Sequence, residues 1–106
     1  MNDLMRPSLY NARHKIENLV ESSEKKDLYS VVGPVCETAD SFGSDFEVSA
    51  NAGDYLAIYS AGAYGSSMGS NYNTRLKPAE ILVDQKSHKV IRKAEAFDDL
   101  IKEEEL

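Results

Sequence analysis

The chain has 106 residues and a formal net charge of −6, with 18 Asp and Glu against 12 Lys and Arg. It is long enough for one small domain and too short for a TIM-barrel enzyme, which needs about 250 residues. The acidic balance disfavours nucleic acid and anionic membrane surfaces as partners, because both bind basic faces, and no apolar run approaches the roughly 20 residues that cross a bilayer.

The N-terminal segment predicts a helix that begins near Arg6. Pro7 suits the first turn of a helix, where its missing N–H has no partner in any case. The apolar residues between Leu9 and Val20 keep a helical spacing that allows a longer helix. A short helix followed by a strand at 14–20 fits the same pattern, so both alternatives stay open.

Four segments of different character follow. Residues 21–27 are polar and predict a surface loop, whereas the β-branched run at 28–35, which contains Gly-Pro, predicts a buried strand. Residues 39–49 carry several Gly, Ser and Asp residues and predict a loop with at most a short strand. A turn at 53–54 then leads into residues 55–59, whose side chains favour another strand.

The C-terminal half opens with an unusual stretch at 60–73, which is dense in small residues and too poor in bulky ones to form core. Small residues there let the backbone approach a ligand or another chain closely. Residues 79–84 and 88–93 predict a hairpin, and the segment from Phe97 predicts a closing helix with a solvated acidic end. The fold class is therefore mainly β (α+β), a barrel or sandwich with short helices at both ends.

Four sequence blocks occur in the order in which one enzyme family carries them. They are residues 6–10 (RPSLY), 33–40 (GPVCETAD), 61–65 (AGAYG) and 68–75 (MGSNYNTR), the last followed by Pro-Ala-Glu at 78–80. Together they resemble the C-terminal part of the diaminopimelate decarboxylases, which are pyridoxal-phosphate-dependent enzymes of fold type III. The resemblance implies a Greek-key-like β-barrel or sandwich. Residues 1–106 are then an incomplete C-terminal β domain, without the N-terminal TIM barrel that binds pyridoxal 5'-phosphate.

The substrate that this resemblance implies, meso-diaminopimelate, has a distal centre with both a carboxylate and an ammonium group. Arg6 offers a planar fork for the carboxylate, and Tyr10, one helical turn further on, adds a hydroxyl. Glu37 supplies the negative partner for the ammonium. The resemblance implies that Cys36 is the proton donor after carbon dioxide leaves, entering from the partner subunit, and that Tyr64 touches both substrate and cofactor.

Each of these side chains also has an ordinary structural interpretation. Arg6 and Glu37 are typical of solvated surface charges, and Tyr10 and Tyr64 of half-buried or interface tyrosines. A single cysteine such as Cys36 is commonly a small buried hydrophobe. Their joint occurrence in the family's blocks, and not any single position, favours the functional interpretation.

Two positions in the cysteine block stand out, Ala39 for the shape of the loop and Glu37 for the type of decarboxylase. Ala39 stands where the family commonly has glycine, so a positive φ there would be strained. Glu37 favours diaminopimelate over ornithine, because the ornithine enzymes usually carry aspartate beside the cysteine. The alternatives are the C-terminal domain of an ornithine- or arginine-type decarboxylase and a free-standing binding or dimerisation module.

The remaining expectations concern the surroundings of the chain. The single cysteine excludes an intrachain disulfide and fits a reducing cytosol, so the predicted location is cytoplasmic. His14 and His88 lack metal-ligand spacing, so no metal site is predicted. None of the eight lysines lies in a recognisable Schiff-base context, and the chain alone is therefore expected to be inactive. Unpaired edges such as 28–35 are expected to drive self-association into a homodimer or larger assembly.

Overall fold

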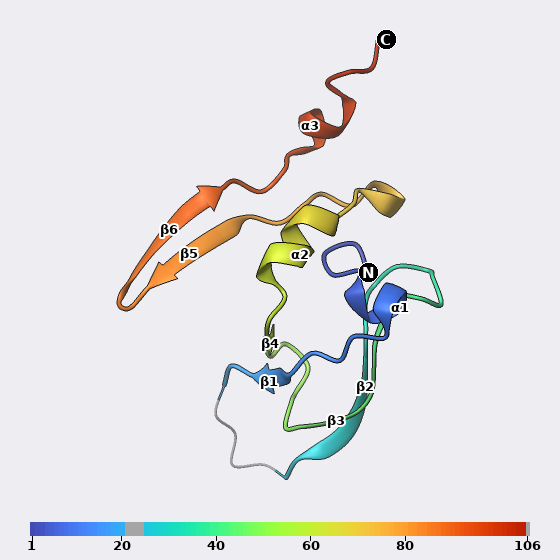
Figure 1. The fold of residues 1–106 in the computed structure, drawn as a ribbon, viewed down its shortest axis with the longest axis vertical. Helices are drawn as coiled ribbons and strands as arrows, with labels where there is room; N and C mark the ends of the chain where they lie inside the picture. Colours follow the sequence, from blue (N-terminus) through green and yellow to red (C-terminus); the bar gives the residue numbers. More distant parts are fainter. Residues whose placement is uncertain (21–24, 106) are drawn as a thin grey trace.

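The computed structural model describes residues 1–20 and 25–105 and shows a mainly β arrangement with a few short helices (Figure 1). In chain order the elements are α1 (Arg6–Tyr10), β1 (Ile16–Asn18), β2 (Asp27–Val32), β3 (Ser41–Val48), β4 (Leu56–Ile58), α2 (Gly62–Met68), the 3-10 helix η1 (Tyr72–Thr74), β5 (Glu80–Asp84), β6 (Ser87–Arg92) and α3 (Phe97–Ile101). The described strands form three separate antiparallel pairs, β1–β4, β2–β3 and β5–β6, and show no closed barrel. The mainly β prediction is confirmed at this level, and the Greek-key barrel stays a prediction.

The N-terminal helix is short. α1 ends where Asn11 takes a left-handed conformation with φ 53°, which no continuing right-handed helix accommodates. The chain then enters β1, and Ile16 pairs with Ile58 of β4. Of the two alternatives for this segment, the short helix followed by a strand is confirmed, with Pro7 buried in the first turn.

The prediction of a loop at 39–49 is wrong, because β3 runs for eight residues. Phe46 and Val48 are buried on one face of the strand, with the exposed Glu47 between them, and this period of two is the signal of a strand. The turn-forming residues are accommodated by local irregularity. Gly43 has φ 118°, Asp45 has φ 61°, and the register of β2 against β3 shifts nearby.

β2 confirms the strand predicted at 28–35 but not its burial. Leu28 is 69% exposed and Val32 is 64% exposed. Among the described residues β2 has one neighbouring strand and nothing covers its outer face, so the apolar run is left at the surface. The buried hydrophobic residues are few: Leu4, Ile16, Phe46 and Val48. Of the loop predicted at 21–27, residues 21–24 lie outside the described residues and Asp27 already belongs to β2.

The small-residue stretch at 60–73 forms α2 and η1, neither of which the sequence predicted. Its glycines allow a close approach to the N-terminal part of the same chain, and approach to a ligand or another chain stays a prediction. A Cβ on Gly65 would lie 2.9 Å from the carbonyl oxygen of Asp3, and one on Gly69 would lie 3.5 Å from that of Asn2. The strand expected at 55–59, the following hairpin and the closing helix are confirmed as β4, β5–β6 and α3.

The molecule is extended, with the β5–β6 hairpin and α3 reaching away from the rest (Figure 1). Its radius of gyration is 15.8 Å, against about 13 Å for a compact chain of this length. Its accessible surface is 8281 Å², against about 5,900 Å² for a compact protein of this mass. In residues 1–20 and 25–105, no helix has the length and apolar character that crossing a membrane requires.

Candidate functional site

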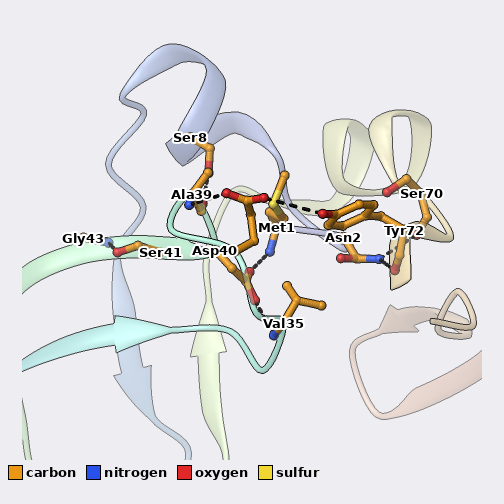
Figure 2. Close-up of polar contacts among 11 residues, drawn as sticks. Met1, Asn2, Ser8, Val35, Ala39, Asp40, Ser41, Gly43, Ser70 and Tyr72 are labelled. Atoms are coloured by element: carbon orange, nitrogen blue, oxygen red, sulfur yellow. Dashed lines mark hydrogen bonds and ion pairs between the residues drawn. The ribbon is translucent and has the colours of Figure 1, made fainter. Parts of the chain in front are cut away.

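The N-terminal segment, residues 1–10, connects the elements that carry the predicted site residues (Figure 2). The side-chain amide of Asn2 donates to the carbonyl oxygens of Ser70, at 3.2 Å, and Tyr72, at 2.6 Å. The hydroxyl of Ser8 donates to the carbonyl of Ala39. These hydrogen bonds place α1, η1 and the connection between β2 and β3 side by side.

The connection between β2 and β3, residues 33–40, carries Cys36 and Glu37. Its two ends are joined by a hydrogen bond from the Gly33 N–H to the Asp40 carbonyl, at 2.8 Å. A second one, from the Asp40 N–H to the Glu37 carbonyl at 2.9 Å, closes a turn inside it. Cys36 is a free thiol and exposed, so its interpretation as a small buried hydrophobe is wrong. A thiol in this position is accessible to a ligand.

Arg6 and Tyr64 come from different helices, and the guanidinium of Arg6 lies over the ring of Tyr64. The guanidinium carbon of Arg6, at the start of α1, lies 4.8 Å from the centroid of the Tyr64 ring on α2. Such stacking is a favourable cation–π contact and orients the planar fork of the guanidinium. The ring of Tyr64 remains 55% exposed. The pair therefore presents an oriented cation and an aromatic surface together.

Glu37 has an aromatic neighbour that the sequence analysis did not single out. The hydroxyl of Tyr72 donates to Oε2 of Glu37 over a long distance of 3.5 Å. Tyr72 lies inside the block at 68–75, between two asparagines. An aromatic residue in such a turn-forming sequence was the one feature that could have indicated a role for it. For Tyr10 the structure shows a ring that is 61% exposed at the end of α1, and its role stays a prediction.

Asp40 is a second residue whose place the sequence did not reveal. Its side chain is buried, and its carboxylate accepts hydrogen bonds from the Val35 N–H, at 2.9 Å, and from the main-chain nitrogen of Met1 (Figure 2). Burial raises the pKa of a carboxyl group, but these hydrogen bonds, with the nearby charge of Arg75, outweigh burial and hold the pKa of Asp40 below its usual value. Asp40 is therefore ionised at neutral pH.

Elsewhere the charged groups form contacts typical of a surface. Lys15 pairs with Glu17, which raises the pKa of Lys15 and lowers that of Glu17. Residues 1–20 and 25–105 gather no group of three or more His, Cys, Asp or Glu side chains that could hold a metal ion.

Comparison with known proteins gives a family match and close relatives. Residues 1–62 match the family model of the pyridoxal-dependent decarboxylase C-terminal sheet domain. The diaminopimelate decarboxylase of Neisseria meningitidis serogroup A is 48% identical over 98 residues, which cover 92% of this chain and 24% of the relative. That of Aquifex aeolicus is 48% identical over 102 residues, covering 95% of this chain and 24% of the relative.

Solved structures agree. The diaminopimelate decarboxylase from M. jannaschii in co-complex with L-lysine superposes with a TM-score of 0.93 at 42% identity, covering 100% of this chain and 24% of that one. The enzyme from Helicobacter pylori complexed with L-lysine gives a TM-score of 0.87 at 46% identity, covering 96% and 25%. The chain thus spans about a quarter of the length of the relatives it matches.

Proposed function

Since the chain belongs to the pyridoxal-dependent decarboxylases, as their C-terminal sheet domain, we propose that it is the substrate-binding and dimerisation part of a diaminopimelate decarboxylase. The complete enzyme would convert meso-2,6-diaminopimelate to L-lysine and carbon dioxide, the last step of a lysine biosynthesis. The names of the relatives and the L-lysine bound in two of their structures support this choice.

The observation that carries the proposal is the contact of Arg6 with Tyr64, which presents a cation beside an exposed aromatic ring. Glu37, exposed beside Cys36, would supply the anion from the partner subunit, as the resemblance implies for the thiol. The distal end of meso-diaminopimelate carries a carboxylate and an ammonium group, so it needs both charges in one place. The L-lysine product keeps this distal centre, because the carboxyl group leaves from the other end. Lysine entering as a substrate, with its own carboxyl group at the reacting centre, would present only an ammonium there and leave the cation without a partner.

Each predicted residue then has a role in the proposed site. Arg6 binds the distal carboxylate, with the hydroxyl of Tyr10 beside it, and Glu37 binds the distal ammonium. Tyr64 contacts both substrate and cofactor. The thiol of Cys36 holds the proton that replaces the departing carboxyl group at the substrate carbon.

The residues of this chain fit part of the surroundings of pyridoxal 5'-phosphate but not its anchor. The cofactor, when bound, supplies the electron sink for loss of carbon dioxide. A lysine that forms a Schiff base is activated by burial or by a neighbouring cation. None of the lysines in residues 1–20 and 25–105 is buried: Lys77 is half-buried and the others are exposed. We therefore expect the chain alone to be inactive, with the anchor on a barrel domain.

The exposed apolar surface supports binding to further protein. The accessible area exceeds that of a compact protein by more than 2,000 Å², about the size of a substantial interface. β2 and the β5–β6 hairpin present apolar side chains to solvent, among them Leu28, Val83 and Ile91. We propose that a barrel domain and a second subunit cover these surfaces, completing the predicted β-barrel, and that the homodimer is cytoplasmic, as the free thiol of Cys36 favours.

A fusion tests the proposal. The fused enzyme joins this chain to the part of the Aquifex aeolicus relative that lies outside the match. We expect it to bind pyridoxal phosphate, to turn yellow and to release carbon dioxide from meso-diaminopimelate and not from ornithine, whereas the chain alone does neither. Release from ornithine or arginine would favour that type of decarboxylase. A stable complex of the chain with an intact decarboxylase, without activity in the fusion, would favour a free-standing module.

A further inference from the structure

A buried carboxylate with two separate donors lies at the base of the loop that carries Cys36. The side chain of Asp40 is 1% exposed. Its Oδ2 accepts the Val35 N–H at 2.9 Å, and its Oδ1 accepts the main-chain nitrogen of Met1. Each carboxylate oxygen thus accepts a hydrogen bond from a different part of the backbone. Losing either bond would leave a buried charged oxygen without a partner, which is costly in free energy.

Gly33 fits against the same carboxylate. A Cβ at this position would lie 2.2 Å from Oδ2 of Asp40, closer than any two such atoms approach, and the Gly33 N–H donates to the Asp40 carbonyl at 2.8 Å. The backbone on one side of the loop therefore packs directly on the side chain from the other side. Gly33 therefore has no room for a larger residue unless the Asp40 carboxylate moves.

These contacts fix the chain immediately before Cys36 and immediately after Glu37. Val35 is held by the carboxylate, and the Glu37 carbonyl accepts the N–H of Asp40 itself at 2.9 Å. The two functional residues stand between these two fixed points. Their own side chains are exposed and are not packed into a core that would hold them.

We propose that Asp40 is a positioning residue whose carboxylate, seated against Gly33, sets the places of the Cys36 thiol and the Glu37 carboxylate. This inference rests on the proposed function for the roles of those two side chains. It adds that both are positioned by one buried anion, which acts through the backbone and does not touch the substrate.

Asp40→Asn tests the inference, because asparagine keeps the shape but offers one acceptor oxygen to the two donors. Asp84→Asn, at an exposed position on β5, is the matched control. In the fused enzyme we expect Asp40→Asn to lower kcat for meso-diaminopimelate about 100-fold, since displacing a reacting group by about 1 Å costs that much. The amide of Val35 is expected to exchange faster with deuterium, and the alkylation rate of Cys36 by iodoacetamide to change. Asp84→Asn is expected to leave all three unchanged.

Gly33→Ala is a second, independent variant, and it tests the inference if the Asp40→Asn enzyme does not fold. Its added methyl group should displace the carboxylate and reproduce the loss in kcat. A Gly33→Ala/Asp40→Ala double variant should lose about as much as Asp40→Ala alone, because both changes remove the same contact. The inference would be overturned if the folded Asp40→Asn and Gly33→Ala variants had the same kcat, the same exchange rate at Val35 and the same alkylation rate at Cys36 as the Asp84→Asn control. If the unsubstituted fused enzyme is inactive, the proposed function fails, while exchange and alkylation measured on the chain itself still decide whether Asp40 positions the loop.

Discussion

The guanidinium of Arg6 lies over the ring of Tyr64, with 4.8 Å between the guanidinium carbon and the ring centroid. One residue comes from α1 and the other from α2, more than fifty positions apart in the chain. The stack fixes the orientation of a planar cation beside an exposed aromatic ring. A substrate carboxylate binds such a fork through two parallel hydrogen bonds, which a lysine cannot reproduce.

Arg6→Lys is therefore expected to raise KM for meso-diaminopimelate in the fused enzyme by about tenfold or more, the value of a hydrogen bond to a charged group. Arg13→Lys is the control, because Arg13 also stacks on an aromatic ring, 4.4 Å from the centroid of Phe46, but outside the proposed site. Steady-state kinetics of both variants checks the prediction. Equal KM values would contradict the role of Arg6.

Cys36→Ala is expected to lower kcat by about 10² to 10⁴, the usual contribution of a general acid, with little effect on KM. The reason is that in the proposed site the thiol holds the proton that the product receives but does not bind the distal end of the substrate. The measurement is the rate of lysine formation. Thr38→Ala changes an exposed neighbour in the same loop and should retain full activity; a loss as large as that of Cys36→Ala would show that the loop, and not the thiol, is responsible.

Glu37→Gln is expected to raise KM for meso-diaminopimelate, because it removes the anion that we propose binds the distal ammonium. Tyr72→Phe removes the 3.5 Å hydrogen bond to Glu37 and should raise KM less, by about two- to tenfold, as for one neutral donor. Tyr55→Phe, whose ring is 76% exposed, serves as the control. If Tyr72→Phe and Tyr55→Phe gave the same KM, Tyr72 would have no part in the site.

The attachment of the β5–β6 hairpin is expected to weaken in acid. Oε2 of Glu95 accepts the Lys77 N–H at 2.7 Å and the Asn71 side-chain amide at 2.6 Å, and the first of these bonds is the main cause of a pKa below the usual 4.5. Because the folded-state pKa is the lower one, the contribution to stability is present above about pH 4.5 and is lost as the pH falls through the folded-state value.

Deuterium exchange at the Lys77 amide, corrected for its intrinsic rate, should therefore lose protection below pH 4.5 in the parent chain. In Glu95→Gln the protection should be lower and nearly independent of pH in this range. Glu103→Gln, in the exposed tail, should behave as the parent does. The same pH dependence in all three chains would rule out Glu95 as the group that titrates.

The isolated chain is expected to self-associate through β2. Leu28 and Val32 are 69% and 64% exposed on a strand that has one described neighbour, and such edges recruit further strands. Replacing both with Lys should increase the monomer fraction in sedimentation experiments. Leu19→Lys, at a residue that is 65% exposed but outside the strands, should not. A monodisperse monomer of the parent chain at high concentration would contradict the prediction.

From the sequence, local helices and strands could be predicted better than the burial of residues or the contacts between them. Pro7, the strand-favouring residues at 55–59 and the hairpin at 79–93 are local signals, and each led to the element that the structure shows. The burial of β2 was predicted wrongly, because burial depends on what covers a strand and not on the strand's own residues. β3 was missed because Gly43 and Asp45 are typical of turns, and the bulge that accommodates them is a property of the pair of strands.

The candidate site likewise combines residues that the sequence indicated with residues that only the structure revealed. Resemblance to a family identified Arg6, Cys36, Glu37 and Tyr64 as a set, and the structure added that Arg6 stacks on Tyr64. Tyr72 and Asp40 were missed because their importance lies in contacts across long stretches of chain. Neither residue type is unusual at its position, so spacing carried no signal.

The hydrogen bonds of Asn2 also determine when the site can form during synthesis. Asn2 donates to a carbonyl 70 positions further along the chain, at Tyr72. A contact between residues so far apart in sequence forms slowly, because closing the long loop between them costs conformational entropy. During synthesis Tyr72 also leaves the ribosome long after Asn2. A nascent or truncated chain that ends before Tyr72 therefore exposes the loop with Cys36 without the contacts that complete its surroundings.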